Sequence, residues 1–241
     1  MENFVINLAR EPQKFENFLK LNSGSKIDFR RYDACDGAAL GEAEAVKMKI
    51  VMPGTKFTHG SIGCAVSHFR LWQQCIEKRD PILVFEDDAA VRNDFNEALP
   101  KLLAGLERWD YVTFGYNTDS ILDIEIANGI NSAVAFSPQY PDDKSLKDFV
   151  RSTKQPSAYR LNNCFGTCGY AISPEGAKRL SKLCFPMNNR TITIAALNRS
   201  FPAFNFDCIL NDVYRKMDAY AVFPPLVVPK NDRKVSTTIN A

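Results

Sequence analysis

Three consecutive acids end an apolar run in the first half of the chain. Glu86, Asp87 and Asp88 directly follow the residues ILVF, which have the composition of a buried strand. Carboxylates held side by side repel one another, so a cation, a basic neighbour or a trapped proton normally neutralises them. Their oxygens suit Mg²⁺ or Mn²⁺, whose remaining ligands can be substrate phosphates. The triplet is therefore a candidate metal site. The alternative is that one acid caps the next helix and the others are solvated.

The elements around the acids predict where they lie. Strands and amphipathic helices alternate as far as residue 115, which predicts an α/β fold. The expected strands are 4–8, 27–37, 82–88 and 110–115, and the expected helices are 11–24, 40–50, 62–76 and 95–106. Ligands of open α/β sheets bind beyond the carboxyl ends of the strands, where the acids lie. Alternate residues of a strand face the same way, so Glu86 and Asp88 are expected to point together and Asp87 elsewhere.

The pattern weakens in the second half of the chain. Residues 117–160 are polar and predict long loops with one short helix. Beyond them we expect a strand in TCGYAIS, a helix in PEGAKRLSKL and a last helix from Asp207 to Met217, followed by an extended, basic tail. No repeat or clean linker divides the sequence. We therefore expect residues 1–241 to form a single domain, with 117–160 as a variable loop region.

The composition narrows the class of protein. The 241 residues carry a formal net charge of +2, with 45% hydrophobic and 24% charged residues, which is typical of a soluble globular protein. This balance indicates no nucleic-acid partner. The seven cysteines are odd in number and several lie in apolar runs, which favours reduced thiols and a reducing compartment. No stretch is typical of a signal peptide or a transmembrane segment. We expect a cytoplasmic protein.

Seven short motifs in fixed order resemble a known family. They are FVINLAR, RYDACDG, GSIGCAVSHFRLWQ, ILVFEDDAAVRNDF, WDYVTFG, TCGYAISPEGAKRL and FDCIL. Their order is that of glycosyltransferase family 25, which includes bacterial lipooligosaccharide galactosyltransferases and has the collagen galactosyltransferases among its relatives. The resemblance covers most of the chain outside residues 117–160. Its most specific part is IGCAVSH followed by VFEDD.

The resemblance implies a fold and a reaction. The fold would be GT-A-like, an α/β Rossmann-type mixed sheet flanked by helices. The donor would be a UDP-sugar, most often UDP-galactose, and transfer would invert the anomeric carbon. The acid triplet matches the family's counterpart of the metal-binding D-x-D motif, so Glu86 and Asp88 would hold Mn²⁺ or Mg²⁺ on the diphosphate. Glu86 and Asp87 would also lie near the ribose or the sugar.

Further residues match the family's donor pocket. They are Asn7, Arg10, Asp36, Gly37, Gly169 and Tyr170. Arg10 is expected to reach a donor phosphate or the nucleotide, although an exposed arginine in the first turn explains it equally well. Asp36 and Gly37 would line the nucleotide pocket, although a plain turn is a near-equal alternative. Gly169 would permit close backbone approach to the donor sugar, with Tyr170 as a pocket wall.

Asp207 is the candidate general base. The family's matching acid falls where an inverting enzyme needs a group to take the proton of the acceptor hydroxyl. A helix cap is the alternative, because Asp207 opens an expected helix. Asn205 and Phe206 precede it, where the family often has a proline and a small apolar residue.

Cys64 and His68 are spaced by four on an expected helix, and Cys164 and Cys168 repeat that spacing. Four such ligands can form a structural zinc site, but neither pair has the short C-x-x-C spacing, so core thiols are the favoured interpretation. His68 is also a candidate contact for donor or acceptor, with packing under the sheet as the alternative.

Together these features predict a metal-dependent inverting galactosyltransferase that acts on a glycan or glycolipid such as a bacterial lipooligosaccharide. A glycolipid acceptor would imply peripheral contact with the inner face of the membrane. The alternatives are another sugar, a protein hydroxyl as acceptor, or a catalytically silent nucleotide-sugar-binding module. A hydrolase with Glu86 and Asp88 as its carboxylate pair is disfavoured, because neighbouring acids at one strand end cannot flank a glycosidic bond.

Overall fold

The structure is a computed structural model that describes residues 1–137 and 139–231. Within them, one mixed sheet of 11 strands runs in the order β2-β1-β3-β9-β5-β12-β8-β6-β7, with β13 paired to β5 and β4 paired to β13. The strands are β1 (Glu2–Asn7), β2 (Phe29–Asp33), β3 (Ile82–Glu86), β4 (Ala89–Val91), β5 (Tyr111–Gly115), β6 (Ile121–Ala127), β7 (Ile130–Ala135), β8 (Ser157–Cys164), β9 (Gly169–Ile172), β12 (Ala219–Phe223) and β13 (Val227–Pro229). A separate hairpin joins β10 (Thr191–Ile194) to β11 (Arg199–Pro202).

The directions of the strands confirm the predicted fold class. β2, β1 and β3 are parallel, and β5 and β12 are parallel to each other. Between these groups β9 runs antiparallel to both β3 and β5. The result is an α/β, GT-A-like Rossmann-type mixed sheet, in which the carboxyl ends of β1, β2 and β3 meet at one edge.

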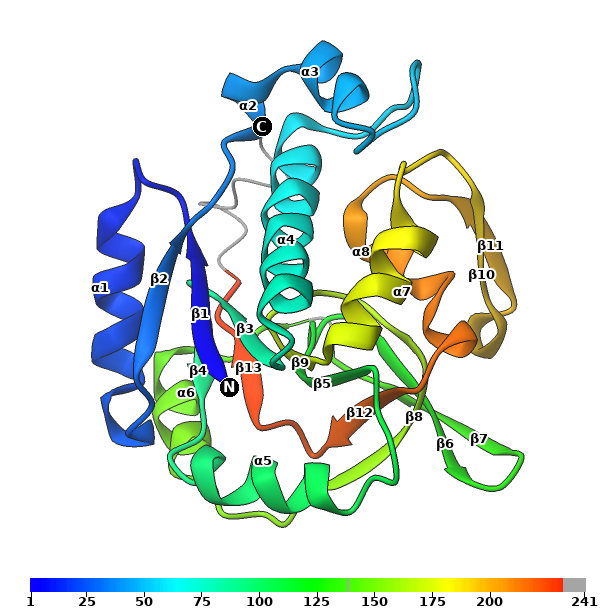
Figure 1. The fold of residues 1–241 in the computed structure, drawn as a ribbon. Helices are drawn as coiled ribbons and strands as arrows, with labels where there is room; N and C mark the ends of the chain where they lie inside the picture. The colour runs from blue at the N-terminus through cyan, green and yellow to red at the C-terminus, as the bar shows by residue number, and fades with distance from the viewer. Residues whose placement is uncertain (138, 232–241) are drawn as a thin grey trace.

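Helices cover both faces of this sheet (Figure 1). They are α1 (Pro12–Leu21), α2 (Gly37–Leu40), α3 (Glu42–Lys47), α4 (His59–Lys78), α5 (Phe95–Ala104), α6 (Asp143–Val150), α7 (Pro174–Cys184) and α8 (Phe206–Asn211), with 3-10 turns at Ser23–Ser25, Ala195–Leu197 and Tyr214–Lys216. The long helix α4 lies beside α7 and α8.

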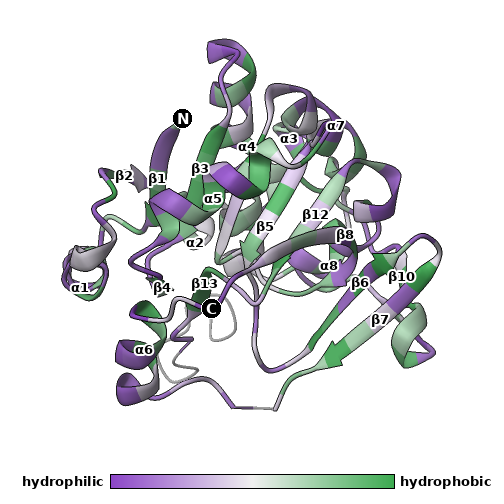
Figure 2. Ribbon diagram, turned by 90° about the horizontal axis from the view of Figure 1, so that it is seen from below, coloured by the Kyte–Doolittle hydropathy of each residue, from purple (hydrophilic) through white to green (hydrophobic). Residues whose placement is uncertain are grey.

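Strand alternation divides the core in two. Val84 of β3 packs with Trp72 of α4 on one face, in the larger hydrophobic cluster. Phe85, its neighbour in sequence, packs on the other face with Phe18 of α1 and Phe95 of α5. Figure 2 shows hydrophobic residues along β3 and β5, in the middle of the sheet. Burial on both faces explains why β3 reads as a continuous apolar run.

Several expectations for the second half of the chain were wrong. Residues 117–160 contain the one short helix that was expected there, α6, but they also contain the hairpin of β6 and β7, and β8 begins at Ser157. The hairpin was missed because β7 and the end of β6 are largely solvated, so that only the start of β6 carries a buried apolar run. The expected helix from Asp207 to Met217 ends at Asn211 and continues only as a 3-10 turn.

The final segment is partly regular. β12 and β13 both pair with β5, so the apolar part of the expected tail belongs to the sheet. The remainder of the predicted basic tail, from residue 232, lies outside the described residues. No helix in the described ranges combines the length and the apolar character needed to cross a membrane.

Candidate active site

A cleft opens where the carboxyl ends of β1, β2 and β3 meet the first turns of α2 and α4. Five members of the predicted donor set line it: Arg10, Asp36, Gly37, Glu86 and Asp87. They come from three separate segments of sequence, which the parallel strands bring to one edge of the sheet. The cleft therefore has the position expected of a ligand site in an open α/β sheet.

Two glycines allow the cleft wall to form. A Cβ atom on Gly37 would lie 1.7 Å from the carbonyl oxygen of His59, and one on Gly63 would lie 2.5 Å from that of Cys35. The start of α4 therefore packs backbone against backbone on the start of α2. Ser67 fixes the contact, because its Oγ accepts from the Cys35 amide at 2.8 Å and donates to the Gly63 carbonyl at 2.7 Å.

Arg10 and Asp36 face each other at the mouth of the cleft as an ion pair. Asp36 also accepts from the Ala38 amide at 3.1 Å, so it caps α2 as well as lining the cleft. Each residue therefore fits both of its interpretations from sequence in part. Arg10 lines the cleft but is about half exposed, and Asp36 lines the cleft but also belongs to a turn. The pair places one positive and one negative group beside the acid triplet.

Each acid of the triplet has its own hydrogen-bond partner. The Thr167 hydroxyl donates to Glu86, and Asn7 Nδ2 donates to Asp87 at 2.6 Å. The backbone amide of Asn231 donates to Asp88 Oδ2 at 3.2 Å. Asp88 Oδ1 is buried and has no hydrogen-bond partner among the described residues. One oxygen in the triplet is therefore left without a partner from the described residues, and it is a candidate ligand atom for a bound ion.

Burial raises the pKa of all three acids, and repulsion within the triplet adds to the shift for Glu86 and Asp88. Burial, followed by the charge of Asp88, raises the pKa of Glu86 to about 8, although the Thr167 hydrogen bond opposes the shift. Burial and the charge of Asp87 raise the pKa of Asp88 to about 6. Burial also raises the pKa of Asp87, against the bond from Asn7. A bound cation would relieve this repulsion, which is the chemistry that the triplet suggested.

The strand geometry differs from the expected alternation. β3 ends at Glu86, so Asp87 and Asp88 lie in a turn rather than on the strand. Even so, the charge of Asp88 raises the pKa of Glu86 more than the charge of Asp87 does. Joint binding of one ion by Glu86 and Asp88 stays a prediction.

Gly169 and Tyr170 lie behind the cleft. The Tyr170 side chain is 1% exposed, and its hydroxyl contacts His68 Nδ1 at 2.7 Å and accepts from Trp72 Nε1 at 3.0 Å. A Cβ atom on Gly169 would meet the Phe114 ring at 2.8 Å, so this glycine makes room for the core. Tyr170 therefore supports a cleft residue, His68, in place of forming the cleft wall itself.

Asp207 lies in the first turn of α8. Asn205 is the cap of this helix, because its side chain accepts from the Cys208 amide at 3.1 Å, so the capping interpretation of Asp207 was wrong. The Gly166 amide donates to Asp207 Oδ2 at 2.9 Å, while Oδ1 is buried without a hydrogen-bond partner in the described part of the chain. Burial raises the pKa of Asp207, and its charge in turn raises that of Glu86.

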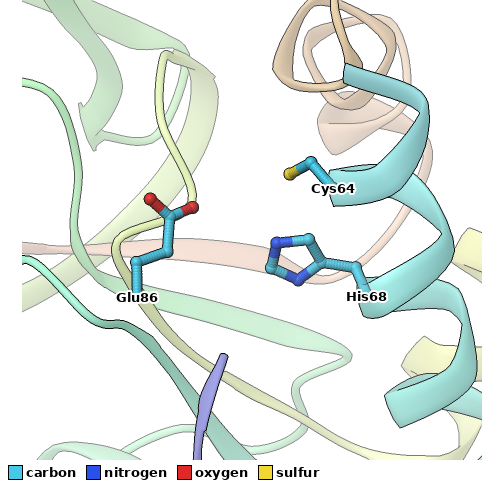
Figure 3. A group of neighbouring side chains, drawn as sticks. All are labelled: Cys64, His68 and Glu86. Carbon is cyan, nitrogen blue, oxygen red and sulfur yellow. The ribbon is translucent and has the colours of Figure 1, made fainter. Parts of the chain in front are cut away.

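The four-ligand grouping of Cys64, His68, Cys164 and Cys168 does not form. Cys164 and Cys168 are buried in two different hydrophobic clusters, and the seven cysteines are free thiols. Among the described residues, one group of three candidate ligands lies together: Cys64, His68 and Glu86 (Figure 3). The candidate ligand beside Cys64 and His68 is thus Glu86 and not the pair of Cys164 and Cys168.

Sequence reasoning missed two residues that position the acids. Thr167 lies in the TCGYAIS motif, and a buried threonine just before a strand was the available signal. Asn231 acts through its backbone amide, which any residue except proline carries, so no sequence signal marks it.

Comparisons with known proteins show the family of this chain. The family model described as glycosyltransferase family 25 (LPS biosynthesis protein) matches residues 1–196. Procollagen galactosyltransferase 2 of Mus musculus is 27% identical over 192 residues, which are 74% of this chain and 27% of that protein. Lipooligosaccharide biosynthesis protein lic2B of Haemophilus influenzae is 29% identical over 205 residues, which are 84% of this chain and 70% of that protein.

Not every relative is active. Inactive glycosyltransferase 25 family member 3 of Homo sapiens is 31% identical over 127 residues, which are 47% of this chain and 21% of that protein. This chain thus spans about a quarter of the length of its mouse and human relatives. The family match ends before Asp207, so the interpretation of that residue depends on its geometry.

Proposed function

The chain belongs to glycosyltransferase family 25, and from this premise we propose that it transfers galactose from UDP-galactose to a hydroxyl of a glycan, with inversion. The acceptor we propose is a bacterial lipooligosaccharide, reached at the cytoplasmic face of the membrane by peripheral contact. The observation that carries the proposal is one cleft at a strand edge, with three acids of raised pKa and a fourth, Asp207, beside them.

The acid triplet fits a hard divalent ion. Asp88 keeps one buried oxygen without a hydrogen-bond partner among the described residues, and its charge raises the pKa of Glu86 more than any other nearby charge does. Oxygen ligands of this kind suit Mn²⁺ or Mg²⁺, which also accept phosphate oxygens. When bound, the ion would neutralise charge on the departing UDP. Asp87 is held by Asn7 at the cleft edge, and it would contact the ribose or the sugar.

The remaining cleft residues bind and orient the donor. Arg10 and Asp36 at the cleft mouth would contact the nucleotide, with the arginine directed to the phosphates. Gly37 would line the nucleotide pocket, and it lets the start of α2 pack directly on the backbone of α4, which fixes the cleft wall. These contacts would hold the sugar in a fixed orientation toward the acceptor.

Asp207 would take the proton of the attacking hydroxyl. The Gly166 amide fixes Oδ2, which leaves the unpartnered Oδ1 to accept that proton. Burial raises the pKa of the carboxyl, which makes it a stronger base than a solvated aspartate. Because the hydroxyl becomes more acidic as the new bond forms, a positioned carboxylate is sufficient.

A silent nucleotide-sugar-binding module is the second candidate, because an inactive human family member is 31% identical to this chain. The presence of both the triplet and Asp207 favours an active enzyme. Transfer of another sugar, or to a protein hydroxyl, would use the same donor cleft, and the two acceptor types are separated only by assay.

The test is a screen of the purified protein against UDP-sugars and glycan acceptors in Mn²⁺, Mg²⁺ or chelator, with UDP release as the signal. We expect turnover with UDP-galactose that chelator abolishes. We expect Asp88→Asn to weaken Mn²⁺-dependent UDP binding by at least about 10-fold in calorimetry, whereas Asp33→Asn, at the exposed end of β2, leaves it unchanged. Equal UDP affinity with Mn²⁺ and with chelator would contradict the metal role.

A further inference from the structure

Three ligand types converge on the inner wall of the cleft. Cys64 and His68 are one helical turn apart on α4, so they share a face of that helix. Glu86 ends β3 directly opposite, and Figure 3 shows the thiol and the ring turned toward its carboxylate. One donor atom from each residue lies within 4.8 Å of the other two.

His68 is oriented for a ligand. Its Nδ1 contacts the Tyr170 hydroxyl at 2.7 Å, and Trp72 Nε1 donates to the same hydroxyl at 3.0 Å. The ring also stacks on Phe206, with centroids 5.4 Å apart. Nε2 is therefore the nitrogen left to face Cys64 and Glu86. Histidines that bind metals are commonly fixed in this way, through a hydrogen bond to the other ring nitrogen.

The three groups do not satisfy one another. Within the described part of the chain, Glu86 bonds to Thr167 and His68 bonds to Tyr170, but no hydrogen bond joins Cys64, His68 and Glu86 to each other. Cys64 is half-buried and borders the cleft together with His68 and Glu86. The set is thus fixed in place, close together and reachable from solvent.

We propose that Cys64, His68 and Glu86 form a binding site for a zinc-class divalent ion. Sulfur, nitrogen and carboxylate ligands together favour Zn²⁺ and Co²⁺, whereas an all-oxygen set favours Mn²⁺ or Mg²⁺. Three protein ligands leave a fourth position open to the cleft, as in zinc sites that bind water or a substrate oxygen.

The distances fit this geometry with small adjustments. Bonds of about 2.0–2.3 Å in a tetrahedral site place ligands about 3.3–3.8 Å apart. Donor atoms that are at most 4.8 Å apart therefore need to close by no more than about 1.5 Å. Rotation about the side-chain bonds of Cys64 and Glu86 supplies such a movement without a change in the backbone.

The proposed zinc-class site differs from the proposed Mn²⁺ or Mg²⁺ site on the donor, although Glu86 is a ligand in both. Only one consequence rests on the proposed function: an ion at Cys64 and His68 would draw Glu86 away from the ion on the diphosphate. Zn²⁺ would then weaken donor binding in the presence of Mn²⁺.

Cobalt titration of the metal-free, full-length protein tests the site. Co²⁺ bound by a thiolate gives a sulfur-to-cobalt charge-transfer band, together with visible bands typical of four-coordination. We expect these to saturate at one equivalent and to disappear when Zn²⁺ is added. Cys64→Ser should abolish the charge-transfer band. Cys35→Ser, which removes the other half-buried thiol of the same cleft, should keep it.

Two further variants separate the possible failures. Asp88→Asn should keep the cobalt–thiolate band even where it abolishes Mn²⁺-dependent UDP binding, so the two proposals fail independently. Tyr170→Phe removes the hydroxyl that orients His68 and should weaken Co²⁺ binding by about 10- to 100-fold while the band remains. Absence of the band in the wild type, or its persistence in Cys64→Ser, would overturn the proposal.

Discussion

The two parts of the site are built in different ways. The donor side is the cleft at the ends of the parallel strands β1, β2 and β3, where the start of α2 packs on α4 through backbone contacts. The other part consists of single groups brought from far along the chain, which are not among the residues that line the cleft. Thr167 reaches Glu86 across 81 residues, and the Asn231 amide reaches Asp88 across 143. Asp207 is held by Gly166, 41 residues before it.

Under the proposed function, we expect this difference to separate donor binding from proton transfer. A strand edge supplies several fixed groups at once, which suits a large charged ligand such as a nucleotide. The short helix α8 supplies one carboxylate with one unpartnered oxygen, which suits a single proton. We therefore expect substitutions on the donor side to change affinity and stability, and substitutions at α8 to change turnover.

The largest effect is expected at Asp207. Asp207→Asn keeps an oxygen for the Gly166 amide but cannot take a proton, so turnover should fall about 10²- to 10⁴-fold. Mn²⁺-dependent UDP affinity and the melting temperature should stay near those of the wild type. Initial rates at saturating donor, beside calorimetry of UDP binding, measure the two effects.

Asp212→Asn is the matched control for this variant. Asp212 lies at the other end of α8 and pairs with Arg190 and Lys216, each at 3.1 Å. Its replacement should change the rate little, because two cations already hold this carboxylate in ion pairs. If Asp207→Asn turns over normally, or if only Asp212→Asn is slow, the base is not Asp207.

The next effect is expected at Gly37, on the donor side. An alanine Cβ would lie 1.7 Å from the His59 carbonyl oxygen, so α4 must move away from α2. We expect Gly37→Ala to lower the free energy of unfolding by about 1–3 kcal/mol and to weaken UDP binding. Urea unfolding and calorimetry measure these changes.

Gly105→Ala gives the contrast, because its nearest heavy atom would be 3.4 Å away, at the end of α5. We expect a change within about 0.5 kcal/mol and unaltered UDP binding. Equal stability of the two variants would show that the close contact of α2 and α4 does not support the donor side.

The same difference explains which parts of the fold and of the site could be predicted from the sequence. On the donor side the chemistry lies in local patterns: an apolar run that ends in acids, and apolar residues at helical spacing in α4. The first pattern correctly predicted a strand and the second correctly predicted a helix. The cleft lies where the strand ends were expected to meet. The strand β12 was missed, because its five residues lie among prolines and charges and are recognised only by pairing with β5 and β8.

The contacts in the other part of the site depend on tertiary pairing. Nothing local in Asn205 or Asp207 decides which of the two caps α8, since both types accept amide hydrogen bonds at helix starts. The structure decides it through Gly166, which holds the Asp207 carboxylate outside the cap position. The ligand grouping at Glu86 also had to await the structure, because it joins a helix face to a strand end.

The smallest effect concerns Glu86, where the two sides meet, and its sign follows from its pKa. The folded protein holds the Glu86 proton up to about pH 8, whereas the unfolded chain releases it near 4.5. The stability that this proton contributes is therefore complete below pH 4.5 and is lost as the pH rises through 8. Glu86→Gln keeps an oxygen that can accept from Thr167 but has no proton to lose.

Glu86→Gln should consequently match the wild type at pH 4.5 and exceed its free energy of unfolding by on the order of 1 kcal/mol at pH 8, both measured in chelator by guanidinium unfolding. This difference in the free energy of unfolding is well below the one that corresponds to the full pKa shift, because the cleft is open to solvent. Glu77→Gln, on the exposed side of α4, should show no such dependence on pH. Mn²⁺ at pH 8 should reverse the order, because only the wild type retains this carboxylate for the ion. Parallel pH profiles for the wild type and Glu86→Gln would mean that repulsion within the triplet is already relieved in the folded chain.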